Sequence, residues 1–114
     1  MKVNFKGKEV EIPDVRECKG LAMGIGLMFS RREKAKALVF EFDKPTRMAI
    51  HSFFVFFPFL AVWLDEENNV LEIKRVKSFI PRIYPRKSYS KLVEIPLNEC
   101  YDDKVKILVG DRKI

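Results

Sequence analysis

The sequence predicts a single domain that consists mainly of β-strands, with one helix in the N-terminal half. Two patterns lead to this prediction. Short apolar segments recur roughly every ten residues, and turn-forming residues separate them. One segment near the N-terminus instead has apolar residues at helical spacing. About seven short strands with one covering helix favour a β-sandwich or a partly closed, distorted barrel.

The N-terminal third predicts a hairpin followed by the helix. Apolar residues alternate on both sides of Lys6-Gly7-Lys8, which is typical of two strands joined by a glycine turn. Pro13 then ends the second strand. The helix is expected over residues 14–23, where Asp14 caps the first turn and Glu17 has the spacing of a capping box.

The rest of the chain predicts five further strands, which Pro, Asp and Asn residues separate as in tight turns. Residues 47–54 are expected to form a short strand or a bend, and residues 97–103 a turn of helix. The five expected strands cover residues 37–42, 59–64, 70–76, 91–95 and 105–109.

The composition indicates a basic, globular, thermophile-like protein. The 114 residues include no Gln and a single Thr, and the formal net charge is +6. Loss of labile amides with many Lys and Glu is typical of hyperthermophile proteins. The charge favours anionic partners, although it also serves solubility. We expect a cytoplasmic protein without a membrane partner, because no signal peptide is seen and the longest apolar segment is shorter than the roughly 20 residues of a membrane span.

The two cysteines, Cys18 and Cys100, are expected to be free thiols, as in most cytosolic proteins. A disulfide is the less favoured alternative. Two cysteines and one histidine are too few for a structural zinc site. Neither a metal nor another cofactor is therefore expected.

The single histidine, His51, is not expected to belong to a catalytic triad. A triad needs a serine within hydrogen-bond reach of the imidazole. Ser52 would point to the opposite side of an extended segment, and the chain has no nucleophile elbow. We interpret His51 as a structural or pocket-lining residue, and we assign no catalytic residue.

Five of the ten phenylalanines lie within residues 53–59. A sheet with one hydrated face cannot bury all five, because neighbours in a strand face opposite sides. Three interpretations stay open: a core covered by a folded-back loop, an apolar cleft, or an interface between subunits.

Residues 74–91 contain seven basic side chains, no acid and several aromatic residues. Such a stretch either binds an anion, with rings that stack on bases or sugars, or forms a solvated loop. No nucleic-acid-binding motif accompanies it. Together with the aromatic segment, it gives the candidate ligand-binding residues His51, Phe54, Arg82, Tyr84, Arg86 and Lys87.

Several short strings, taken in order, cover essentially the whole chain. They include a Gly-Leu-Met-Phe string after the expected helix and an aromatic segment before Pro58. The strings are Gly26-Leu27-Met28-Phe29, residues 50–58, 62–65, 70–71 and 92–96, and Gly110-Asp111. In this order they resemble the domain-of-unknown-function family 192 (DUF192). The resemblance implies a jelly-roll-like or distorted-barrel fold and no established function.

Two positions depart from that family's pattern. Leu60 stands where the family usually has Asp, two residues after the proline, and Phe56 stands where many members have a polar or basic residue. If the family's acid performs chemistry, this chain has lost it. If the acid is structural, Leu60 replaces it by packing.

We therefore expect a small, non-enzymatic binding domain for an anionic ligand, with an anionic small molecule as its partner. One alternative is a small enzyme that acts on a phosphorylated or carbohydrate substrate. A further alternative is a nucleic-acid accessory protein.

Overall fold

A computed structural model gives the fold of the chain and describes residues 1–18, 26–28 and 30–110. The mainly β fold with about seven strands is confirmed, because the described residues form seven strands in two sheets. The strands are β1 (Lys2–Phe5), β2 (Lys8–Glu11), β3 (Arg16–Glu17), β4 (Leu38–Thr46), β5 (Phe59–Leu64), β6 (Val70–Val76) and β7 (Tyr89–Pro96).

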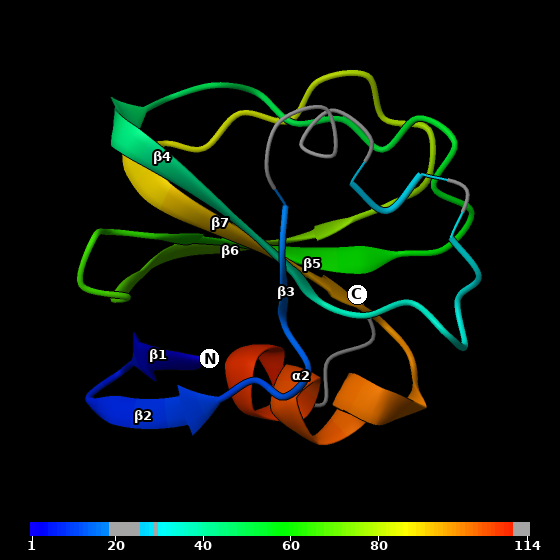
Figure 1. Cartoon of the computed structure of the whole chain (residues 1–114), viewed down its shortest axis with the longest axis horizontal. Helices are drawn as coiled ribbons and strands as arrows, with labels where there is room; N and C mark the ends of the chain where they lie inside the picture. Colours follow the sequence, from blue (N-terminus) through cyan, green and yellow to red (C-terminus); the bar gives the residue numbers. More distant parts are fainter. Residues whose placement is uncertain (19–25, 29, 111–114) are drawn as a thin grey trace.

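The larger sheet has five strands in the order β3-β4-β7-β5-β6 (Figure 1). Strand β7 lies in the middle and pairs antiparallel with both β4 and β5. All six residues of β5 are buried, and their sequence is continuously apolar. A strand with this pattern is covered on both faces of its sheet.

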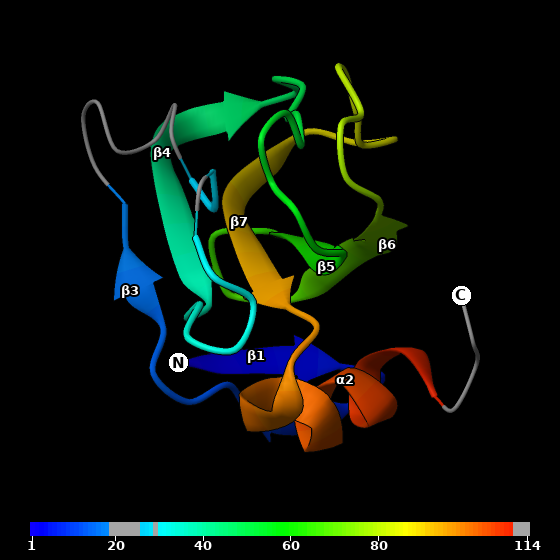
Figure 2. The same ribbon diagram turned by 90° about the vertical axis from the view of Figure 1, so that its right-hand side faces the viewer.

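The two faces of this sheet are covered differently (Figure 2). One face packs against the β1–β2 hairpin and the helices η1 (Glu99–Tyr101) and α2 (Asp102–Val109). Loops of residues 47–58 and 77–88 lie over the other face. Alternation along β5 sends Leu60, Val62 and Leu64 to the first core and the remaining three residues to the second.

The helix expected over residues 14–23 is wrong for the part that the structure describes, and residues 19–23 lie outside it. Asp14 has a φ of 52°, which is not helical, and Arg16–Glu17 form β3 instead. The Arg16 N–H donates to the Ala37 carbonyl at 2.9 Å, so the segment gains a parallel partner in β4. Strand pairing therefore overrides the capping-box spacing.

The strand expected over residues 105–109 is also wrong, because these residues belong to α2. A short apolar run is compatible with a buried strand and with a helix. Val105, Leu108 and Val109 have the spacing of one helix face, and they also lie in a nearly continuous apolar run. All three contact the first core. Asp102 and Asp103 in the first turn favour the helix through its dipole.

The remaining expectations on local structure are met where the structure describes them. The N-terminal hairpin and the strands at residues 37–42, 59–64, 70–76 and 91–95 are confirmed. Cys18 is buried and Cys100 is exposed, and both are free thiols as predicted. Within residues 1–18, 26–28 and 30–110, no helix is long and apolar enough to cross a membrane.

Tyr101 connects the C-terminal helices to the chain around β3 and β4. Its ring is fully buried, and its hydroxyl accepts a hydrogen bond from the Ala37 N–H at 2.8 Å. The same hydroxyl donates to the Asp14 carbonyl at 3.3 Å. These two bonds hold the turn before β3 and the start of β4 against one side chain.

We expect Tyr101→Phe to lower the free energy of unfolding by about 1–3 kcal/mol, because the buried Ala37 N–H loses its acceptor. Chemical denaturation measures this. Tyr84→Phe is the matched control, since the Tyr84 side chain is 54% exposed and should tolerate the change. Equal stabilities of the two variants would show that the Tyr101 hydroxyl is not structural.

Candidate functional site

The loops of residues 47–58 and 77–88, called the paired loops below, are joined by hydrogen bonds around Ser52. The Ser52 N–H donates to the Ile80 carbonyl at 2.8 Å, and the Phe79 N–H donates to the Ser52 carbonyl at 2.9 Å. The buried hydroxyl accepts from the Ile80 N–H at 2.7 Å and donates to the Lys77 carbonyl. Ser52 is therefore a structural residue, and its hydroxyl is not available as a nucleophile.

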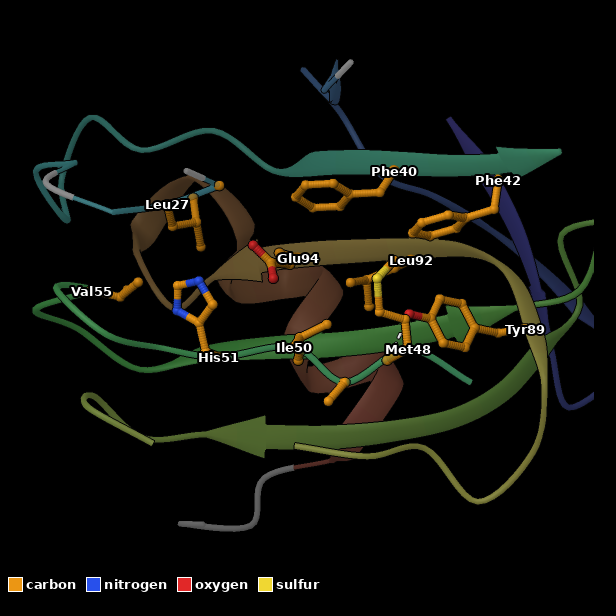
Figure 3. Close-up of a pocket in the computed structure, with 12 residues that line it drawn as sticks. Leu27, Phe40, Phe42, Met48, Ile50, His51, Val55, Tyr89, Leu92 and Glu94 are labelled. Atoms are coloured by element: carbon orange, nitrogen blue, oxygen red, sulfur yellow. Dashed lines mark hydrogen bonds between the residues drawn. The ribbon is translucent and has the colours of Figure 1, made fainter. Parts of the chain in front are cut away.

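A cavity of about 290 Å³ lies between the second face of the sheet and the first of the paired loops (Figure 3). Its walls are mostly apolar. Phe40 and Phe42 of β4 and Leu92 of β7 come from the sheet, and Ile50 and Val55 come from the loop. Its volume is close to the lower end of the roughly 300–1,000 Å³ range of small-molecule sites.

Glu94 of β7 places a carboxyl group on the wall of this cavity. The residue is only 6% exposed, because its neighbours across the sheet are Leu38 of β4 and Ala61 of β5. Within the part of the chain that the structure describes, no hydrogen bond or ion pair reaches the carboxyl. Burial raises the pKa of Glu94 to about 8, so the group is mostly protonated at pH 7.

Gly26 lets the backbone approach the Glu94 carboxyl. A Cβ atom on residue 26 would lie 3.2 Å from Glu94 Oε1 and 3.7 Å from the Phe40 ring. Gly26 also has a φ of 52°, in the left-handed region that favours glycine. The glycine that begins the Gly-Leu-Met-Phe string therefore serves the shape of the cavity.

His51 projects into the same cavity from the loop, toward the side that carries Glu94 (Figure 3). Its Nδ1 accepts a hydrogen bond from the Phe53 N–H at 3.2 Å. In the neutral imidazole the proton must then be on Nε2, which makes Nε2 a hydrogen-bond donor. The loop geometry thus fixes the tautomer of His51.

Tyr89 forms the wall at the opposite end of β7. Its hydroxyl donates to the Met48 carbonyl at 2.8 Å, and its ring meets Phe42 edge-to-face at 5.5 Å. Burial, and to a lesser extent Glu94, raises the pKa of Tyr89 to about 12. Tyr89 is therefore neutral and already hydrogen-bonded. Among the described side chains that line the cavity, the polar groups left to meet a ligand are those of Glu94 and His51.

The structure separates the predicted ligand-binding residues into two groups. His51 lines the cavity, whereas Phe54 is 48% exposed and does not line it. The other four lie on the surface of the second paired loop, outside the cavity: Arg82, Tyr84, Arg86 and Lys87. Of the six predicted residues, His51 is therefore the one that lines this cavity.

Several of the seven basic residues have structural partners. Lys74 donates to the Tyr84 carbonyl at 2.8 Å and pairs with Glu72 at 3.5 Å. Glu72 also accepts from the Arg86 backbone N–H at 2.7 Å. Lys91 donates to Asn68 at 2.7 Å. The side-chain charges of Arg82, Arg86 and Lys87 meet no acidic partner among the residues that the structure describes.

The five clustered phenylalanines have different surroundings. Phe57 and Phe59 are buried in the second core. Phe53, Phe54 and Phe56 are 43%, 48% and 60% exposed. The aromatic segment therefore belongs only in part to the core, and part of it forms the surface of the paired loops.

Sequence reasoning missed Glu94 as a site residue, although the string Leu92-Val93-Glu94-Ile95 contained a usable signal. An acid in the middle of an apolar strand is rarely fully buried without a partner. Leu60, in contrast, is fully buried in the first core, on the face of the sheet away from the cavity. Leu60 therefore contributes packing and lies outside the site.

A metal site is not apparent in residues 1–18, 26–28 and 30–110: no group of three or more His, Cys, Asp and Glu side chains there could hold an ion. The cavity has one carboxyl and one imidazole among its lining residues.

We expect Glu94→Gln to change how stability depends on pH. The unfolded carboxyl titrates near 4.5 and the folded one near 8, so between these values the folded state binds more protons. The free energy of unfolding should thus fall as pH rises, by on the order of 1 kcal/mol per unit from this group. Denaturation at pH 5 to 8 should show this slope in the wild type and its absence in Glu94→Gln. Glu66→Gln, in an exposed turn, is the control, and parallel curves for Glu94→Gln and wild type would contradict the assignment.

Comparisons with known proteins agree with this fold. A putative transcription regulator from Sinorhizobium meliloti has a similar structure, with a TM-score of 0.73 and 14% identity over 91% of this chain and 82% of that one. A protein of unknown function from Novosphingobium aromaticivorans is also similar, with a TM-score of 0.67 and 12% identity over 90% of this chain and 74% of that one. None of the curated proteins matches the sequence. The sequence profile of DUF192, described as "Uncharacterized ACR", matches residues 7–113, so the chain belongs to the domain-of-unknown-function family 192.

Proposed function

We propose that this domain is a binding protein for a small organic molecule, which occupies the cavity between the sheet and the paired loops. The observation that supports this most directly is Glu94, an ionisable group on the wall of an apolar cavity with no partner among the described residues. Buried polar groups are nearly always hydrogen-bonded in folded proteins, so each exception calls for an explanation. A ligand group that bonds to Glu94 would provide it.

The cost of Glu94 to stability supports the same proposal. Burial of a polar group without a hydrogen bond costs roughly 1–3 kcal/mol in proteins. An apolar side chain would fit this position between Leu38 and Ala61 without that cost. A destabilising residue in a preformed cavity is typical of a functional site.

Binding without catalysis is the better fit for this cavity. A carboxyl group with a pKa of about 8 also suits proton transfer, which keeps the enzyme alternative open. However, the hydroxyl groups of Tyr89 and Ser52 are both engaged with backbone carbonyls, so neither serves as a nucleophile. We also propose a cytoplasmic location, which the two free thiols support.

We expect compounds with an eight-carbon chain (octanol, octanoate and octylamine) to bind in the cavity with affinities on the order of 0.1–1 mM for the best of them. NMR chemical-shift changes should centre on His51, Leu92 and Glu94. Ala49→Leu, which fills part of the cavity, should weaken binding at least about tenfold. Val105→Leu on the other side of the sheet is the control. If none of the three compounds shifts these signals, the cavity is not a binding site.

A second candidate function is anion binding on the surface of the second paired loop. Arg82, Arg86 and Lys87 are exposed there without acidic partners among the described residues, beside the exposed ring of Tyr84. Arg grips phosphate with two parallel hydrogen bonds, and an aromatic ring stacks on bases. A nucleotide or a short single strand would suit this surface.

We expect the double variant Arg82→Gln, Arg86→Gln to weaken binding of a short single-stranded oligonucleotide. The slope of log affinity against log salt should fall by about 1.4, since roughly 0.7 counterions per phosphate contact are released. Fluorescence anisotropy at several salt concentrations measures both effects. Lys8→Gln with Lys104→Gln, on the opposite layer, removes the same charge and should change the affinity less. If the wild type binds no oligonucleotide at low salt, this second function fails.

A further inference from the structure

The geometry of the cavity points to one ligand class: we propose that it binds a monocarboxylate with an apolar body, whose carboxylate accepts hydrogen bonds from Glu94 and His51. This inference rests on the proposed binding function and specifies its ligand. The apolar lining of the cavity accounts for the apolar body of the ligand, and Glu94 and His51 account for its carboxylate.

Both free polar groups of the cavity are hydrogen-bond donors. His51 Nε2 carries the imidazole proton, because Nδ1 accepts from the Phe53 N–H at 3.2 Å. The protonated carboxyl of Glu94 offers an O–H. Both side chains project into the cavity from opposite walls, the loop and β7 (Figure 3). A ligand group that accepts two hydrogen bonds therefore completes the site.

A carboxylate uses these donors better than an uncharged oxygen does. Hydrogen bonds from O–H to an ionised acceptor are shorter and roughly twice as strong as bonds between neutral groups. A carboxyl and a carboxylate that share one proton avoid the repulsion between two ionised groups. The formal net charge of +6 also favours the approach of an anion.

An amine fits this site less well. An ammonium group has hydrogen-bond donors and no acceptor, so it could not accept a hydrogen bond from the Nε2–H of His51. It would also require Glu94 to ionise among Phe40, Leu92 and Leu27, and ionisation in such surroundings is unfavourable. The lining residues that the structure describes include neither Lys nor Arg, so a ligand with several negative charges would lack compensation among them.

The proton on Glu94 makes binding depend on pH in a defined direction. Among the described residues, three other titratable groups face or adjoin the Glu94 carboxyl: Cys18 after β3, Tyr89 on β7 and His51 on the loop. Burial and Glu94 raise the pKa of Cys18, and they raise the pKa of Tyr89 to about 12. Because burial raises the pKa of Glu94 to about 8, Glu94 is the group expected to lose its proton between pH 7 and 9.5.

The test compares octanoate, octanol and octylamine, which share one apolar chain, by calorimetry or NMR titration at pH 7 to 9.5. At pH 7 octanoate should bind about tenfold more tightly than octanol, and octylamine should bind most weakly. Above pH 8 the affinity for octanoate should fall about tenfold per pH unit. Octanoate binds the form of the protein in which Glu94 is protonated, and the fraction of that form falls about tenfold per unit above the pKa. Octanol should show a much smaller change.

Glu94→Gln provides the matched control, because its amide N–H₂ donates a hydrogen bond but does not titrate. This variant should bind octanoate with little dependence on pH. The pH profile of the wild-type protein tests the proposal even if the variant does not fold. Tighter binding of octylamine, or affinity for octanoate that is constant to pH 9.5 in the wild type, overturns the monocarboxylate assignment and leaves the binding function intact. Absence of binding by all three compounds overturns both.

Discussion

The central position of β7, paired with β4 on one side and β5 on the other, is the constraint on which the rest of the structure depends. A strand in that position is covered on both faces, so most of its side chains are buried on one face or the other. Val93 and Ile95 enter the core under the hairpin and α2, and Leu92 enters the core under the paired loops. Glu94 follows the same alternation as Leu92, which places a carboxyl group inside the protein.

The second core remains open at Glu94 because the described segments that cover that face, residues 47–58 and 77–88, are loops. Loop backbone needs partners, and Ser52 supplies several of them to the paired loops through its backbone and its hydroxyl. Phe54 and Phe79 have φ values of 57° and 61°, which are strained for bulky residues. Such strain persists only where the surrounding structure holds it, and it is common near functional sites. In this protein it accompanies the loop geometry that orients His51.

The sequence predicted a strand correctly wherever its pattern of apolar residues was compatible with a strand and not with a helix. The continuous apolar run of β5, bounded by Pro58 and the acidic turn, could only be a core strand. The segment at residues 105–109 had two interpretations, because Val105, Leu108 and Val109 fit a helix as well as a strand. Asp14 had the spacing of a helix cap, but the choice of β3 depends on a partner in β4 that is distant in the sequence. Local spacing does not encode such pairing.

The site was less predictable than the fold because its two polar groups come from separate elements. His51 was identified as a pocket-lining candidate because it is the single histidine beside an aromatic segment. Glu94 was seen only as part of a family string, since its burial depends on the strand order β4-β7-β5. The seven basic residues between positions 74 and 91 are close together in the sequence, so the sequence alone reveals them. The cavity is formed by residues that are distant in the sequence and become neighbours only in the folded sheet.

The basic surface and the cavity nevertheless belong to the same layer of the molecule. The second paired loop carries Arg82, Arg86 and Lys87, and the first paired loop carries His51 on the cavity wall. Charges that lie outside a site raise the local concentration of an oppositely charged ligand without touching it. Among the described residues that line the cavity there is no Lys or Arg, so these residues select by hydrogen bonds and by the shape of the apolar walls. Attraction by the surface and selection by the cavity would then be separate steps, and an organic anion is the class of ligand that both features favour.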